Sequence, residues 1–208
     1  MHPQATDWDA YYARPYRTAN LTRRYTASIL VSLLRRFGSP RPWIVELGGA
    51  NSCFFDRLQT TLDPSRYTVV DNNEKGLELF RRRVAGQPNV DVLQADLAMA
   101  PPQLEADIVF SVGLVEHFDE AGTQRLIDAH FAAARPGGIV LVTAPTPTVL
   151  YRMVRSAAEQ LGVWIFHDER PIPPSELQGH TSAGRTLLFQ KTLWPLVLTQ
   201  HLVVWRAE

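Results

Sequence analysis

Cysteine and lysine are scarce in this chain of 208 residues, and long apolar runs are absent. Cys53 is the single cysteine, which excludes an intramolecular disulfide and a compact zinc site built on cysteines. Lys75 and Lys191 are the only lysines, so the basic side chains are almost all scattered arginines. The 21 basic residues balance 21 acidic ones to a formal net charge of zero. Nothing in this charge balance indicates a nucleic-acid partner.

No apolar run approaches the roughly 20 residues that a membrane span requires. The first residues also lack the basic-then-apolar pattern of a secretory signal. We therefore expect a cytoplasmic protein without a membrane partner. The length and an apolar fraction of 45% are sufficient for one domain with a sizeable core.

Residues 43–55 combine a short apolar run, a turn of small residues and the start of an apolar helix. The run is typical of a parallel strand that is buried on both faces. Within it, Glu46 is a carboxylate that is costly to bury unless it is paired or used. The turn at Gly48, Gly49 and Ala50 lets the backbone approach a nucleotide at the carboxyl end of the strand.

This turn is a poor dinucleotide-binding fingerprint, because alanine and cysteine occupy the second and third glycine positions. A nicotinamide oxidoreductase is thus a weaker alternative. Asp71 lies about 20–25 residues beyond the turn, where an open sheet places an acid against a ribose.

Strand-like and helical segments alternate along the rest of the chain. We predict helices at about 18–37, 121–134, 149–161 and 175–182. We predict strands at 43–47, 67–70, 90–93, 106–110, 139–143, 186–193 and 198–205.

Five landmarks stand in a fixed order: the glycine turn, Asp71, Asp96, the pair Glu116-His117, and a Pro-Gly-Gly turn at 136–138. Together they resemble the class I S-adenosylmethionine-dependent methyltransferases over residues 43–144. The resemblance implies an α/β fold with a doubly wound, seven-stranded, mostly parallel sheet and an antiparallel C-terminal hairpin. It also implies one domain over 1–208, with a helical N-terminal extension at 1–40 and an acceptor-binding or lid insert at 145–185. No second catalytic domain is expected.

The same resemblance implies S-adenosyl-L-methionine as the cofactor and S-adenosyl-L-homocysteine as its product. Asp71 would hold the ribose, Asp96 and Leu97 would frame the adenine, and Glu46 would orient the glycine turn. The implied cofactor-binding residues are Glu46, Gly48, Gly49, Ala50, Asn51, Asp71, Asn72, Asp96, Leu97, Ser111 and Gly113.

His117 is the candidate general base, since an unperturbed imidazole titrates near neutrality. Relatives in which the Glu-His pair serves only cofactor or helix geometry leave a second interpretation open. Candidate acceptor-binding residues are Tyr11, Tyr12, Tyr16, Trp164, His167 and Arg170, for which plain packing is the alternative. No metal site is predicted, because consecutive residues such as 167–169 point to alternating faces of an extended chain.

We therefore expect methyl transfer to an O, N or C nucleophile of a small-molecule acceptor. The sequence leaves open the acceptor, the atom that is methylated and the oligomeric state. An alternative from another class is a catalytically inactive, methyltransferase-like partner subunit.

Overall fold

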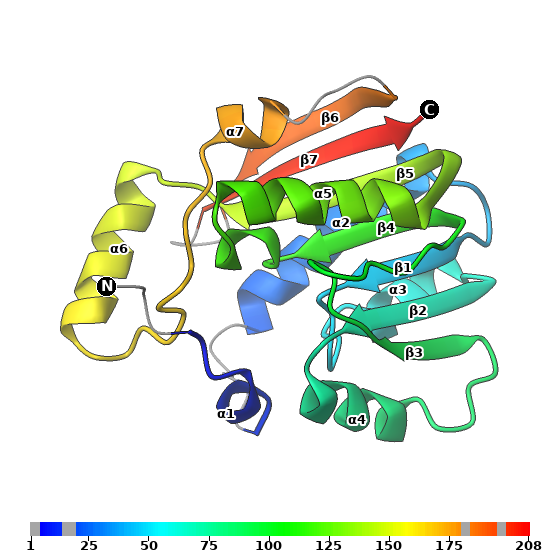
Figure 1. Cartoon of the computed structure of the whole chain (residues 1–208), viewed down its shortest axis with the longest axis horizontal. Coiled ribbons are helices and arrows are strands. Elements are labelled where there is room, and N and C mark those ends of the chain that lie inside the picture. The colour runs from blue at the N-terminus through cyan, green and yellow to red at the C-terminus, as the bar shows by residue number, and fades with distance from the viewer. Residues whose placement is uncertain (1–4, 14–19, 180–183, 195–198) are drawn as a thin grey trace.

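The computed structural model describes residues 5–13, 20–179, 184–194 and 199–208. Its strands form one sheet in the order β3-β2-β1-β4-β5-β7-β6 (Figure 1). All neighbouring strands are parallel except β7, which runs antiparallel to both β5 and β6. The bounds are β1 Trp43–Leu47, β2 Arg66–Asp71, β3 Val90–Gln94, β4 Ala106–Val112, β5 Ala134–Pro145, β6 Arg185–Leu193 and β7 Gln200–Ala207. The predicted seven-stranded sheet with its antiparallel hairpin is confirmed.

Helices cover both faces of this sheet. Helices α2 and α3 lie behind the strands in Figure 1, and α5 crosses in front of them. Their bounds are α1 Trp8–Ala13, α2 Asn20–Phe37, α3 Phe55–Leu62, α4 Glu74–Arg83, α5 Glu120–Ala133, α6 Val149–Gln160 and α7 Pro174–Gly179, with a 3-10 turn η2 at Val115–His117. Among the described residues, no helix combines the length and the apolar character needed to cross a membrane.

Two apolar clusters on opposite faces of the sheet hold these layers together, because successive side chains of a strand point to opposite sides. In β1, Ile44 packs into the cluster that contains α2, α3 and α4, whereas Val45 and Leu47 pack into the cluster that contains α5 and α7. Glu46 shares the face of Ile44, so its carboxyl enters the α3 side. Each fully buried large apolar side chain contributes about 1.5–3 kcal/mol relative to its exposed state.

Polar side chains fix where several helices begin. Asn73 accepts a hydrogen bond from the Gly76 amide of α4 at 2.7 Å, and Asp119 accepts one from the Gly122 amide of α5 at the same distance. Such caps satisfy amides that have no partner within the first turn. Helix α4 follows the loop at the end of β2, and α5 follows the loop at the end of β4. These loops therefore lie along one edge of the sheet.

The structure moves several of the predicted boundaries. Strand β5 begins at Ala134, ahead of the Pro-Gly-Gly turn, and its register against β4 shifts between Ala106 and Ile108, so that the turn is an irregularity within the strand. Helix α7 covers the described part of the helix predicted at 175–182. Residues 180–182 of that prediction lie outside the described part of the chain, as do 18 and 19 of the first long helix.

Candidate functional site

Two adjoining cavities lie at the carboxyl edge of the parallel strands, on the side where Figure 1 places α1 and α6. The first, of about 300 Å³, is called here the aromatic cavity; residues that line it alone include Tyr11, Glu46, Glu116, Tyr151, Trp164, Phe166 and Glu169. The second, of about 280 Å³, is the aspartate cavity; residues that line it alone include Asp71, Asn72, Asp96, Leu97 and Asp168. The residues common to both are Trp8, Tyr12, Gly48, Gly113 and His117. The cavities therefore adjoin, and His117 stands at their junction.

The glycine turn after β1 brings bare backbone to this junction. Gly48 has a φ of +71°, and a Cβ there would lie 2.7 Å from Leu114 Cδ1. Its amide donates to the Val70 carbonyl at 2.8 Å, which ties the turn to the end of β2. Ala50 is buried with a φ of +37°, a left-handed conformation that alanine adopts only under tertiary constraint.

Glu46 supports the turn from below. Its carboxylate accepts a hydrogen bond from the Tyr67 hydroxyl at 2.6 Å. Burial raises the pKa of Glu46 to about 7, although hydrogen bonds from Ser52 and Tyr67 oppose the change. Ser52 also accepts from the Phe54 and Phe55 amides at 3.2 and 3.0 Å, so one hydroxyl joins the turn to the start of α3.

Two aspartates at successive strand ends face the aspartate cavity. Asp71 is buried and accepts from the Asn73 amide at 2.8 Å. Burial raises the pKa of Asp71, against hydrogen bonds from the amides of Asn73, Asn72 and Ala50. Asp96 is exposed and accepts from the Ala98 amide at 2.9 Å, so it caps its own turn while it lines the cavity.

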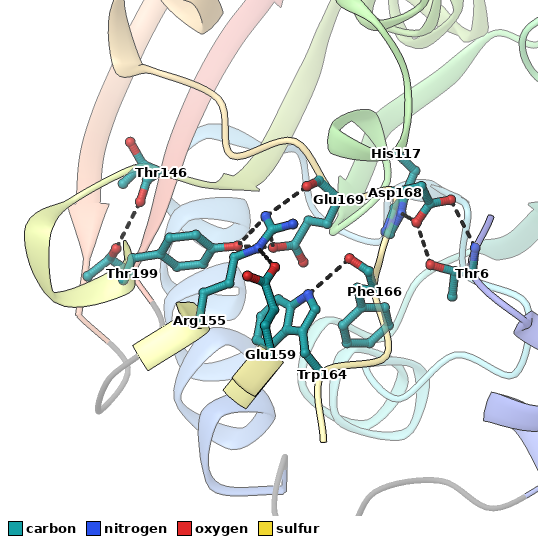
Figure 2. Close-up of polar contacts among 11 residues, drawn as sticks. Thr6, His117, Thr146, Arg155, Glu159, Trp164, Phe166, Asp168, Glu169 and Thr199 are labelled. Carbon is teal, nitrogen blue, oxygen red and sulfur yellow. Dashed lines mark hydrogen bonds and ion pairs between the residues drawn. The ribbon is translucent and has the colours of Figure 1, made fainter. Parts of the chain in front are cut away.

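His117 is oriented by an aspartate that the sequence did not single out. Its Nδ1 lies 2.9 Å from Asp168 Oδ1, and Asp168 also accepts from the amide of Thr6 at 3.1 Å and from its hydroxyl (Figure 2). Burial alone would raise the pKa of Asp168, but hydrogen bonds from Thr6 and His117 outweigh it and the pKa is lowered. An ionised carboxylate only accepts, so Nδ1 of His117 carries the hydrogen and Nε2 keeps its lone pair. Burial lowers the pKa of His117, against the opposing effect of Asp168.

Helix α1 covers the junction from outside. The Trp8 ring contacts the His117 ring edge-on at a centroid distance of 5.0 Å, and Asp9 accepts from the Asn73 side chain at 2.7 Å. Tyr11 and Tyr12 of the same helix line the aromatic cavity, together with Trp164, and their predicted contact with an acceptor stays a prediction. Tyr16 lies outside the described residues.

Some residues of the predicted set line neither cavity, and the roles predicted for them stay predictions. Arg170 pairs with Glu176 at 2.8 Å and lines neither cavity, because its guanidinium turns toward α7. His167 is exposed and also lines neither cavity. Ser111 is fully buried behind the strand end, where its hydroxyl meets Nε2 of His130 at 2.8 Å.

The aromatic cavity has a wall of carboxyl groups that the sequence did not reveal. Glu169 accepts from the Tyr151 hydroxyl, and Arg155 donates to the Glu169 carbonyl at 2.8 Å (Figure 2). Glu116 is 2% exposed. Burial raises its pKa well above the ordinary value, and repulsion from Glu169 raises it further. The sequence predicted an extended chain at 167–169, but residues 167–168 form a turn in which the Glu169 amide donates to the Phe166 carbonyl at 3.2 Å, so alternation gave no signal.

Comparison with known proteins places this edge of the sheet in context. A family model described as a methyltransferase domain matches residues 44–138. Trans-aconitate 2-methyltransferases of Acidovorax sp. (strain JS42) and Acidovorax ebreus (strain TPSY) are each 32% identical over 116 residues. The match covers 55% of this chain and 43% of each relative, so the chain matches less than half the length of these curated proteins.

Solved structures share the fold at low sequence identity. The N-methyltransferase NodS from Bradyrhizobium japonicum WM9, in complex with S-adenosyl-L-homocysteine, has a TM-score of 0.72 and 14% identity, and the alignment covers 96% of this chain and 95% of that one. Magnesium protoporphyrin IX methyltransferase from Synechocystis PCC 6803 has a TM-score of 0.72, 12% identity, and 90% and 84% coverage. A putative methyltransferase in complex with the Haloferax volcanii activator Trm112 has a TM-score of 0.73, 16% identity, and 98% and 99% coverage.

Proposed function

We propose that this chain is a class I S-adenosylmethionine-dependent methyltransferase and transfers the methyl group of S-adenosylmethionine to a small-molecule acceptor. The observation that carries the proposal is the adjacency of the two cavities, with His117 lining both of them. Such a junction at the carboxyl edge of parallel strands is where ligands bind in open α/β sheets.

The residues of the aspartate cavity fit the nucleoside part of the cofactor. In this proposal Asp71 accepts from the ribose hydroxyls, and Asp96 with Leu97 borders the adenine. Asn72 lines the same cavity. Gly48 and Gly113 line both cavities, and their backbone, which carries no side chain, lets the methionine part approach closely. Glu46, Gly49, Ala50 and Asn51 shape this end of the site.

S-adenosylmethionine, when bound, supplies an electrophilic methyl group, and the protein supplies alignment, exclusion of water and a base. His117 fits the role of the base. Its Nε2 lone pair is preserved by the hydrogen bond between Nδ1 and Asp168. Asp168 is then a positioning residue, because it acts through His117.

A small acceptor is favoured over a nucleic acid. The aromatic cavity is of the size at which small-molecule sites begin. The formal net charge of zero also gives the chain no overall attraction to a phosphate backbone.

Calorimetric titration with S-adenosyl-L-homocysteine tests the cofactor site directly. We expect micromolar binding to the wild type and at least about 10-fold weaker binding to Asp71→Asn, since a hydrogen bond to a charged group contributes about 1.5–3 kcal/mol. Asp56→Asn is the matched control, because Asp56 is exposed on α3 and lines neither cavity. Equal affinity in both variants would contradict the assignment of Asp71.

The inactive partner subunit is less favoured, because buried carboxyl groups and an oriented histidine line the two adjoining cavities. If a folded wild type bound no S-adenosyl-L-homocysteine, the partner-subunit interpretation would be favoured instead.

A further inference from the structure

The aromatic cavity has an excess of carboxyl groups over cationic side chains. Glu46, Glu116 and Glu169 line it, and among the described lining residues Arg23 is the one arginine or lysine. Arg23 donates to the Tyr11 hydroxyl. We propose that the wall formed by Glu116 and Glu169 binds a cationic amine, and that the nitrogen of this amine accepts the methyl group. The inference deepens the proposed function and rests on it.

Glu116 provides the first observation. Glu116 lines the cavity, and its Oε2 is buried without a hydrogen-bond partner among the described residues. Leaving a buried carboxyl oxygen unpaired is costly, so native proteins generally provide a partner. Gly113 keeps the space beside this carboxyl open, because a Cβ at that position would lie 3.3 Å from Glu116 Oε1. An ammonium group is the partner that this pocket lacks.

Glu169 is held in place by a separate network, which Figure 2 shows. Tyr151 donates its hydroxyl to the carboxylate, and the Arg155 guanidinium lies 3.9 Å from Glu169 Oε1. Arg155 is also engaged by Glu159 at 2.8 Å, so it is shared between two carboxylates. One arginine therefore offsets only part of the charge of this region, and Glu116 is left uncompensated.

Aromatic rings complete a surface that suits a cation with an apolar body. The Phe166 ring lies 6.0 Å from the ring of Trp8, 5.8 Å from that of Tyr11 and 6.0 Å from that of Trp164. All four line the cavity. Aromatic faces attract ammonium groups, most strongly where water is excluded. A carboxylate-bearing acceptor would instead meet like charge.

The chemistry balances with residues at the same junction. A bound ammonium loses one proton to Nε2 of His117 and becomes a neutral amine. Its nitrogen lone pair forms the new bond to the methyl carbon, and the electron pair of the broken carbon–sulfur bond stays on sulfur. The products are a methylated ammonium and S-adenosylhomocysteine, while protonated His117 returns its proton to solvent.

The test is calorimetric titration of the full chain, saturated with S-adenosyl-L-homocysteine, by ligands with one body and different heads. The probes are 2-phenylethylamine, 2-phenylethanol and 3-phenylpropanoate, with tryptamine, indole-3-ethanol and indole-3-propanoate as a second series. We expect the amines to bind at least 10-fold more tightly than their alcohols and acids. Glu116→Gln and Glu169→Gln should each weaken amine binding about 10-fold or more.

Glu159→Gln is the matched control, since it removes a carboxylate from the same arginine outside the cavity. It should leave amine binding unchanged, and all three variants should keep their affinity for S-adenosylhomocysteine. Equal binding of the three heads, no binding of either amine, or unchanged amine affinity in both cavity variants would overturn the proposal. Loss of S-adenosyl-L-homocysteine binding in Glu116→Gln and Glu169→Gln would also overturn the proposal, because this loss would assign the carboxyl wall to the cofactor site.

The two proposals fail separately. If the wild type binds no S-adenosyl-L-homocysteine, the proposed cofactor site is refuted. The amine titration repeated without this ligand still measures whether the carboxyl wall binds an amine.

Discussion

Replacing Glu46 by glutamine should make the protein more stable at neutral and alkaline pH. Glu46 is buried in β1, and burial raises its pKa from 4.5 to about 7. Glutamine keeps the shape of the side chain and an oxygen that can accept from Tyr67, but it carries no charge. The variant therefore removes the cost of ionising a group inside the core.

The magnitude follows from linkage. Because the pKa of Glu46 is higher in the folded chain than in the unfolded one, the folded state holds the proton more tightly. The free energy of unfolding therefore falls as pH rises from about 4.5 to about 7, and below 4.5 the cost disappears. At about 1.4 kcal/mol per pH unit, the full penalty above pH 7 is about 3 kcal/mol. For a chain of this size that corresponds to about 6–12 °C in Tm.

The assay is urea unfolding of wild type and Glu46→Gln between pH 4.5 and 8, followed by tryptophan fluorescence. Burial also raises the pKa of Glu116 and of Glu169, so the informative quantity is the difference between the two proteins at each pH. That difference should grow by about 3 kcal/mol across the range. Glu78→Gln, which removes a surface carboxylate, should change stability by less than about 0.5 kcal/mol.

A difference that stays constant with pH would refute the reasoning. It would mean that the Glu46 carboxylate is fully compensated in the folded protein, by Arg83 and the hydroxyls of Ser52 and Tyr67, despite its burial and the nearby Asp71.

Three further predictions concern the junction of the cavities. His117→Ala should lower turnover by about 100-fold or more while the affinity for S-adenosyl-L-homocysteine is retained. An unchanged rate would show that His117 does not act as the base. In the wild type, the acid limb of kcat/KM should lie below pH 6.5, because burial lowers the pKa of His117 and the imidazole must be neutral to accept a proton; a limb above 6.5 would contradict this. Gly48→Ala should lower the free energy of unfolding by about 1–3 kcal/mol and weaken the binding of S-adenosyl-L-homocysteine. The new side chain would sit at a positive φ and in contact with Leu114. Unchanged thermal unfolding and unchanged affinity would show that the turn tolerates a side chain.

The order of strands and helices could be predicted from local pattern. The apolar run of β1, the turn at Gly48 and the acid at the end of β2 carry their meaning within a few residues. The parallel core buries its strands on both faces, which produces continuous apolar runs rather than alternation. The predicted boundary of a strand was wrong where a local turn signal competed with sheet pairing. The turn at 136–138 reads as a break in the sequence, yet pairing with β4 extends β5 through it.

Ser111 and Arg170 show a different limit, because residue type alone does not state direction. Ser111 stands at a strand end beside the cavities, but the inward position of His130 provides its partner. Arg170 belongs to the right loop, but Glu176 and the Phe118 carbonyl hold its guanidinium away from the cavity.

The sequence by itself determined the class of fold and the place of the site, because strand ends, tight turns and caps are set by short-range stereochemistry. Only the tertiary structure decided which side chains meet there. His117 and Asp168 are 51 residues apart, and Thr6 and Asp168 are 162 apart. A turn at 167–168 separates Asp168, which lines the aspartate cavity, from Glu169, which lines the aromatic cavity. Packing of the 161–173 segment against α1 and η2 orients the base through Asp168 and leaves Glu116 Oε2 without a hydrogen-bond partner among the described residues.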